Sequence, residues 1–287
     1  MTKGTKAFTC FYTMLLLLKI SIAALIFAIG MSATRRDITY LWHKPILLLK
    51  SIVAMYLVMP VTAVLILLIF DLPSSTELAL VILSICAGAP LLPKKLIKIG
   101  GDPTYVFSLI VTTSLIAIVS VPASLHFLST IISLDTTAVT PAPVALLILK
   151  TFLLPLGLGM LLRRLFSNRV DRIVDPLLKV SGIAMALCAI AILATGFHLV
   201  FDVGLPSLLA FALFTLIALG TGHLFGSPDP STQSSLAIAC SSRHIGLALL
   251  IAANAHRQQH ALALVIGYLL MSAIVSSLYI LMITSKK

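Results

Sequence analysis

The chain has 287 residues, of which 60% are hydrophobic and 10% are charged, and its formal net charge is +11. A soluble domain of this length needs a more polar surface, so the composition excludes one and indicates a polytopic membrane protein. The positive charge does not indicate nucleic-acid binding, because the basic residues stand at the ends of apolar runs and form no single patch.

Apolar runs follow one another along the chain, and each is long enough to cross about 30 Å of hydrocarbon as a helix. No run alternates with period two as the strands of outer-membrane barrels do. We therefore predict an all-α polytopic helical bundle with about nine transmembrane helices. The predicted spans are residues 8–31, 46–70, 75–100, 103–132, 141–163, 173–199, 205–225, 230–254 and 259–284. The first run is too long for a signal-peptide core and has no cleavage pattern after it.

Basic residues gather in alternate connections between these spans, which predicts the orientation. One side receives Arg35, Arg36, Lys44, Lys98, Arg163, Arg164, Arg169, Arg172, Lys286 and Lys287, whereas the opposite connections hold Asp71, Asp135 and Asp202. Lys3, Lys6 and Arg257 are exceptions. Because loops rich in lysine and arginine stay in the cytoplasm, we expect a multi-pass protein of the cytoplasmic (inner or plasma) membrane, with its N-terminus out and its C-terminus in.

Two of the spans are not simple helices. The third contains Gly88, Pro90 and Pro93, and each proline removes an amide donor and clashes with the preceding turn. The eighth has two serines, Ser241 and Ser242, followed by Arg243 and His244. Freed backbone at membrane depth is tolerated only where protein buries it or it lines a cavity. Paired broken helices in the two halves of a chain indicate a transporter's substrate site near the bilayer midplane.

Arg243 stands about half-way along the eighth span, too deep for its side chain to reach water from a lipid-facing position. Such a residue indicates a functional site, because charge in hydrocarbon costs about 3 kcal/mol or more. One interpretation is that the guanidinium binds a substrate carboxylate or sulfonate. The other is a structural internal cation, bound to carbonyls freed at the break. The sequence leaves both open.

His244 can titrate near neutral pH, so protons are a candidate coupling ion; a buried, satisfied histidine is the alternative. Lys94 and Lys95 follow the first break, where they either face the cavity or extend toward the cytoplasmic side. No aspartate or glutamate lies in the middle of a predicted span, so a carboxylate proton relay is not expected.

Paired glycines are predicted to mark close helix packing rather than ligand contact, and the pairs are Gly157 with Gly159 and Gly220 with Gly222. His256 and His260 have a spacing that suits a metal on one helix face. No third ligand stands beside them, so we predict no metal site and no cofactor.

Five segments carry a recognisable pattern. They are Ile29-Gly-Met-Ser-Ala-Thr-Arg-Arg-Asp, Leu57-Val-Met-Pro, Cys86 to Asp102, Lys150 with Leu153-Leu-Pro-Leu-Gly-Leu, and Ile245-Gly-Leu-Ala-Leu-Leu-Ile-Ala. By these segments the chain resembles the bile acid:sodium symporter family over nearly its whole length. The third segment lines up without gaps on the family's first crossover, and the fifth resembles the helix after the second.

The resemblance implies inverted repeats, a panel domain and a core domain, with two broken helices that cross near the midplane. The whole chain, 1–287, would then form one integral membrane transporter domain. Its first repeat, about 1–132, lacks one helix of the family, and its second covers about 141–287. Members of this family move bile acids or other organic anions, usually with sodium.

The family's sodium ligands are almost entirely replaced here. A Ser-Asn pair of the first crossover corresponds to Leu92 and Pro93, two hydroxyl ligands to Val106 and Ile110, the glutamate of the second crossover to Ala239, and glutamine or asparagine positions to Met55, Arg243 and His244. Sodium needs several oxygen ligands, which alkyl side chains do not supply, and a nearby guanidinium would repel it. We therefore expect no sodium coupling at these positions.

The sequence thus predicts a secondary transporter of a small organic anion, not coupled to sodium through the usual family sites. The alternative is a non-transporting membrane protein of the same fold that binds a ligand or partner. An enzyme is not expected, because no nucleophile–base pair or metal cluster is visible. The expected partners are the anion, the lipid bilayer and, as a candidate, protons, but no nucleic acid. The candidate substrate-binding residues are Pro90, Pro93, Lys94, Lys95, Ser241, Ser242, Arg243 and His244.

Overall fold

The structure, a computed structural model, describes residues 17, 20–87, 100–132, 145–146, 148–226, 228–244, 248 and 258–285. All regular elements in these residues are helical, so the expected all-α fold class is confirmed. The chain forms two compact units. Unit 1 comprises Met1–Thr34 and Leu146–His198, and unit 2 comprises Arg35–Ala145 and Leu199–Lys287. The grouping of the chain into two repeats stays a prediction.

Unit 1 is built on a close helix crossing at two glycines. Its elements are the apolar helix Ile20–Ser32, the π-helix η3 (Leu149–Leu153), α9 (Leu154–Leu165) and the residues of α10 (Ser167–Val203) up to His198. A Cβ atom on Gly30 would overlap the carbonyl of Leu156, and one on Gly159 would overlap the carbonyl of Phe27. Only glycine lets the two backbones approach this closely.

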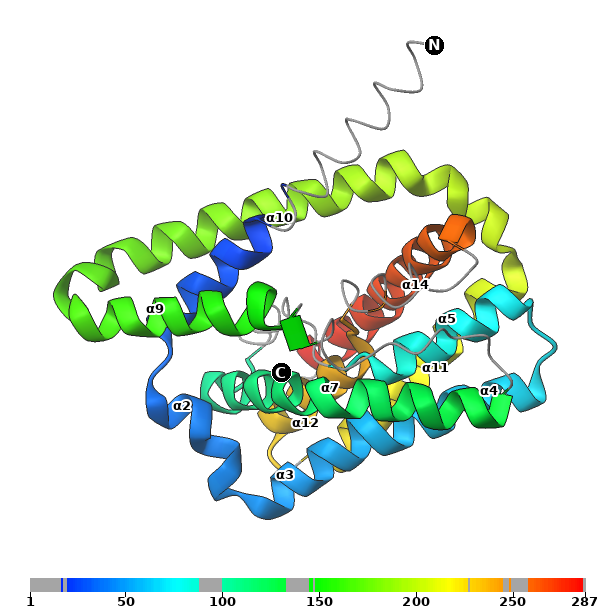
Figure 1. The fold of residues 1–287 in the computed structure, drawn as a ribbon, viewed down its shortest axis with the longest axis horizontal. Helices are drawn as coiled ribbons and strands as arrows, with labels where there is room; N and C mark the ends of the chain where they lie inside the picture. Colours follow the sequence, from blue (N-terminus) through cyan, green and yellow to red (C-terminus); the bar gives the residue numbers. More distant parts are fainter. Residues whose placement is uncertain are drawn as a thin grey trace, which may run out of the picture. The chain divides into compact units, whose positions relative to one another are not determined.

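Unit 2 contains the remaining helices. They are α2 (Arg35–Thr39), η1 (Tyr40–His43), α3 (Pro45–Ile52), the π-helix η2 (Val53–Val58), α4 (Met59–Ile69), α5 (Ser74–Ile85), α7 (Pro103–Ile132), α11 (Leu205–Phe225), α12 (Pro230–Ser241) and α14 (Gln258–Thr284). The long helix α11 packs against α12, α14 and α4 (Figure 1). Helix α11 therefore connects α4, from the N-terminal part of this unit, with α12 and α14, from its C-terminal part.

The rod formed by α3, η2 and α4 contains a proline that explains its π-helical turn (Figure 1). Pro60 has no N–H, so the α-helical bond to the carbonyl of Tyr56 cannot form, and its ring crowds that turn. A widened π turn directly before the proline accommodates both effects without ending the helix. Pro155 follows η3 in unit 1 in the same way.

Asp-Pro pairs begin two of the helices of unit 2. Asp102 Oδ1 accepts a hydrogen bond of 2.9 Å from the amide of Thr104, and Asp229 Oδ2 accepts one of 3.1 Å from the amide of Thr232. Proline suits the first helical position, because the amide that it lacks would have no helical partner there. The aspartates thus cap α7 and α12, and the prolines set their first turns.

Four helices in the described residues are long and apolar enough to cross a membrane: Pro45–Ile69, Pro103–Ser124, Leu205–Phe225 and Ala263–Thr284. Ile20–Ser32 and Ser74–Ile85 are shorter apolar helices. The expected multi-pass membrane protein is confirmed. The helix α10 begins at Ser167, before the predicted span at 173, because the polar residues mark the edge of the apolar run and not the end of the helix.

The two glycines Gly220 and Gly222 of α11 provide a matched test of this packing. A Cβ atom on Gly222 would collide with the backbone of Ala237 in α12, whereas one on Gly220 would meet nothing within 4 Å. We expect Gly222→Ala to lower the free energy of unfolding by about 1–3 kcal/mol. Gly220→Ala should be neutral or slightly stabilising, since alanine favours a helix. Thermal unfolding of the purified variants measures both, and equal effects would contradict the crossing.

Candidate functional site

The two helices predicted to break do end where expected, and their ends meet. Helix α5 stops at Ile85, and Cys86 leaves the helical region with φ −82° and ψ 66°. Helix α12 stops at Ser241, and Ser242 is extended with φ −97° and ψ 123°. The amide of His244 donates a hydrogen bond of 2.9 Å to the carbonyl of Cys86, which joins the two ends. The Ala248 amide donates a hydrogen bond of 3.0 Å to the His244 carbonyl.

The carbonyl of Ser241, freed at the end of α12, is satisfied by side chains from α14. The Tyr268 hydroxyl donates to it at 2.7 Å, and the Ser272 hydroxyl donates to it at 3.2 Å. The Ser241 hydroxyl donates to the Ile238 carbonyl at 3.0 Å and lies 3.3 Å from the Ser276 hydroxyl. Neutral hydroxyls thus occupy the lone pairs that a break exposes, as buried backbone requires.

Arg243 is buried at this junction, with 2% of its surface exposed. Its Nη1 lies 3.5 Å from the carbonyl of Ser84 in the last turn of α5, and its guanidinium carbon lies 5.6 Å from the centre of the Phe214 ring. Its Nε and Nη2 have no hydrogen-bond partner among the described residues, and no described carboxylate pairs with it. The guanidinium is therefore held by weak contacts and is short of acceptors.

Magnitudes show which part of this environment is unfavourable. The negative ends of α5 and α12 stabilise a nearby cation by about 0.3–1 kcal/mol each, or about 2 kcal/mol in partly buried geometry. The aromatic face adds up to about 2 kcal/mol when water is excluded. These terms favour the charge but do not satisfy directed N–H donors, and each unsatisfied donor costs about 1–3 kcal/mol. The site therefore accommodates the charge of Arg243 while leaving two donors to be filled.

Nε and Nη2 share one edge of the guanidinium plane. Two parallel N–H groups on that edge match the two oxygens of a carboxylate, which is the bidentate geometry that arginine forms with planar anions. The arrangement can therefore bind an oxyanion edge-on at the junction of the broken helices.

The structure describes some of the other predicted site residues and not the rest. Ser241 and His244 are buried beside Arg243, and Ser242 is half-buried at the break. Pro90, Pro93, Lys94 and Lys95 lie outside the described residues. The roles of all eight stay predictions.

Sequence reasoning missed the residues of α14 that complete the junction. Tyr268, Ser272 and Ser276 repeat every four residues in an apolar span, which places them on one face of a helix. That polar stripe was a usable signal. Phe214 gave none, because one aromatic residue in an apolar span has no distinguishing pattern.

Four further positions were assigned by resemblance to sodium ligands. Met55, Val106, Ile110 and Ala239 are all buried, with at most 2% of their surface exposed. None of their side chains carries an oxygen.

Residues 19–202, which are more than half of the chain, match the model of a protein family described as the Sodium Bile acid symporter family. No curated protein sequence matches the chain. The matched range ends before α11, so α12 and Arg243 lie beyond it.

The hydroxyls that satisfy the Ser241 carbonyl can be removed singly and together. We expect Tyr268→Phe to lower the free energy of unfolding by about 0.6–1.7 kcal/mol, the range for hydrogen bonds between membrane helices. Adding Ser272→Ala should cost more than the sum of the two single changes, because the buried carbonyl then has no donor. Unfolding of the four proteins of this double-mutant cycle in detergent measures the coupling.

Tyr279→Phe on the same helix is the matched control, since that hydroxyl lies 2.8 Å from the exposed side chain of His223. A Tyr268→Phe effect no larger than that of the control would contradict the role of the network.

Proposed function

The chain belongs to the sodium bile acid symporter family, and on that basis we propose that it is a secondary transporter of a small organic anion in which Arg243 stands in place of a bound cation. Proteins of this family are membrane transporters of bile acids and other organic anions, and not enzymes. The observation that carries the proposal is the buried Arg243 guanidinium at the meeting point of two helix ends, with one edge that finds no acceptor among the described residues.

Independence from sodium at the usual sites is supported by what surrounds this junction. Half-helix C-termini and unwound carbonyls coordinate sodium in transporters with broken helices. Here the Ser241 carbonyl accepts hydrogen bonds from two hydroxyls, and the guanidinium of Arg243 lies at the end of α5. Met55, Val106, Ile110 and Ala239 add no oxygen. Sodium would have few ligands and a repelling neighbour, so the residues present do not fit it.

The substrate class follows from the edge of Arg243 that has no acceptor in the part of the chain that the structure describes. A carboxylate or sulfonate can accept from Nε and Nη2 together, which fills both donors and neutralises the charge in one step. A neutral ligand would fill the donors and leave the charge, whereas a halide would balance the charge but accept with a single atom. We therefore assign an organic oxyanion to this site, with Ser241, Ser242 and His244 beside it.

The two compact units support a division into a core domain and a panel domain. We assign unit 2, which contains α5 and α12, as the core domain, and unit 1 as the panel domain. We place the protein in the cytoplasmic membrane with its N-terminus out and its C-terminus in. The driving force is then the anion gradient, the membrane potential or a proton gradient through His244.

Transport in proteoliposomes tests this function. We expect uptake of a carboxylate or sulfonate to persist when sodium is replaced by potassium or choline. Arg243→Lys keeps the charge but loses the planar fork, so it should raise the substrate KM at least tenfold. Arg172→Met, which removes an exposed arginine of α10, is the matched control and should leave transport unchanged. Strict sodium dependence of the wild type would overturn the proposal, and a protein that binds anions without moving them would be a membrane binding protein instead.

The stability of Arg243→Met separates a substrate-binding arginine from a structural one. Methionine fills a similar volume without unsatisfied donors, so we expect it to raise the melting temperature of the ligand-free protein by about 2–4 °C per kcal/mol relieved. The same variant should lose all stabilisation by added carboxylates. A lower melting temperature without ligand would show that Arg243 serves the fold as an internal cation.

A further inference from the structure

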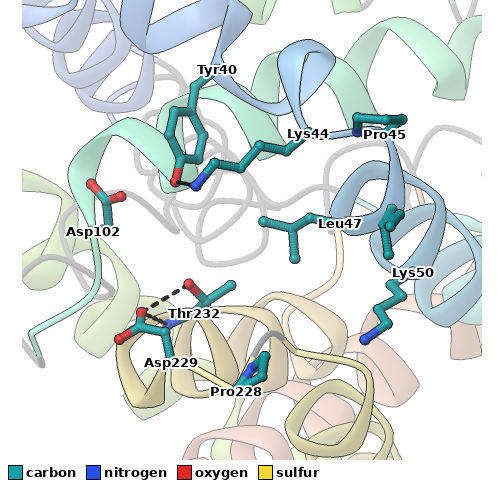
Figure 2. A pocket seen from close by; sticks show the side chains of 10 residues that line it. Tyr40, Lys44, Pro45, Leu47, Lys50, Asp102, Pro228, Asp229 and Thr232 are labelled. Carbon is teal, nitrogen blue, oxygen red and sulfur yellow. Dashed lines mark hydrogen bonds between the residues drawn. The ribbon is translucent and has the colours of Figure 1, made fainter.

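A pocket of about 530 Å³ lies in unit 2, where connections far apart in the sequence meet. Figure 2 shows Tyr40, Lys44 and Lys50 from the first connection and α3, Asp102 from the start of α7, and Asp229 and Thr232 from the start of α12. None of these residues belongs to the junction around Arg243. The volume is within the range of small-ligand sites, about 300–1,000 Å³.

The pocket carries two formal charges of each sign, and the Lys50 ammonium is set apart from the other three. Asp102 and Asp229 lie on one side, and the ammonium of Lys50 lies on the other (Figure 2). The Lys44 ammonium donates to the Tyr40 hydroxyl and lies 4.4 Å from the centre of its ring. Among the described residues, no hydrogen bond or ion pair engages the Lys50 ammonium.

The two carboxylates are held in place by their role as helix caps. Asp229 Oδ2 accepts from the Ser231 hydroxyl and from the amide and hydroxyl of Thr232. The Ser231 hydroxyl bond, followed by the bonds to Thr232, lowers the pKa of Asp229. Asp102 uses Oδ1 for its cap to Thr104, so Oδ2 remains for a ligand. The four formal charges of the pocket therefore sum to zero, with the Lys50 ammonium separated from the two carboxylates.

The part of the pocket around Lys50 borders apolar surface. Ile46 lines the pocket with 73% of its surface exposed, and Leu49 and Trp42 of the same chain segment are 63% and 57% exposed. Lys50 lies five residues into the span that begins at Pro45, which is about 7.5 Å at 1.5 Å per residue. Lys50 therefore lies near one end of the apolar span, and the ends of such spans are where exposed tryptophan is also favoured.

We propose that this pocket binds the zwitterionic head group of a phosphatidylethanolamine lipid, with its phosphate at Lys50 and its primary ammonium at Asp102 and Asp229. The acyl chains lie along the exposed apolar face of α3. A purely anionic head group has no cation to pair with the two carboxylates, which would repel it. A choline head group cannot donate N–H bonds to them, because its nitrogen is fully methylated.

The chemistry that the pocket recognises is an aminoalkyl phosphate, which a soluble compound also offers. The apolar border beside Lys50 favours the lipid, since a soluble ligand gains nothing from Ile46 and Leu49. The inference does not rest on the proposed transport, because no pocket residue touches the junction of the broken helices.

Lipid binding to the full-length protein tests the proposal by native mass spectrometry and by thermal shift in mixed micelles. We expect phosphatidylethanolamine to bind at least tenfold more tightly than phosphatidylcholine or phosphatidylglycerol. Lys50→Gln should weaken it at least tenfold. Asp229→Asn keeps a capping side chain but removes a charge, so it should shift the preference toward phosphatidylglycerol while the protein stays folded.

Lys179→Gln and Asp175→Asn are matched controls on exposed positions of α10 and should leave the lipid preference unchanged. Soluble phosphoethanolamine and inorganic phosphate form the other arms. Phosphoethanolamine that binds as tightly as the lipid would overturn the lipid assignment. A wild type that prefers phosphatidylglycerol, or an Asp229→Asn protein with an unchanged preference, would overturn the pairing of ammonium and carboxylates.

Discussion

The structure depends on one constraint, the need to satisfy backbone groups freed where two helices stop inside an apolar environment. An unpaired backbone group in hydrocarbon costs several kcal/mol, so a break persists only with partners nearby. In the hydrogen bond from the His244 amide to the Cys86 carbonyl, a backbone group from one break satisfies a backbone group from the other. Tyr268 and Ser272 complete the arrangement at Ser241. The packing of α12 and α14 on α11 therefore brings the freed Ser241 carbonyl of α12 to the hydroxyl donors of α14.

A tethered cation changes what such a junction can do. Sodium at a helix break binds and leaves, and its binding can be coupled to that of a substrate. The guanidinium of Arg243 is always present, so it cannot couple an ion gradient to the substrate. It offers instead two directed donors that remain unsatisfied among the described residues. Under the proposed function, the substrate supplies the missing acceptors, and specificity comes from the planar fork rather than from charge alone.

The sequence predicted most of the helices and part of the site. Leu205–Phe225 matches its predicted span, because an apolar run between Gly204 and Gly226 has clear ends. The break near Ser241 was predicted because a charge interrupts an apolar run. Which glycine of each pair packs closely could not be predicted, since Gly220 and Gly222 differ only in what lies opposite them. The pocket was also not predicted, because it combines residues from three connections whose contact is purely tertiary.

The two charged sites of unit 2 illustrate one physical rule at two depths. At the edge of the span, Lys50 is exposed, and its pocket holds two lysines and two aspartates whose formal charges sum to zero. At the junction, Arg243 has helix ends and an aromatic ring but no described carboxylate. Burial strengthens each electrostatic interaction, and it also raises the free-energy cost of each polar group that has no partner. A ligand at the edge therefore adds to a charge balance that already exists, whereas a ligand at Arg243 completes one that does not.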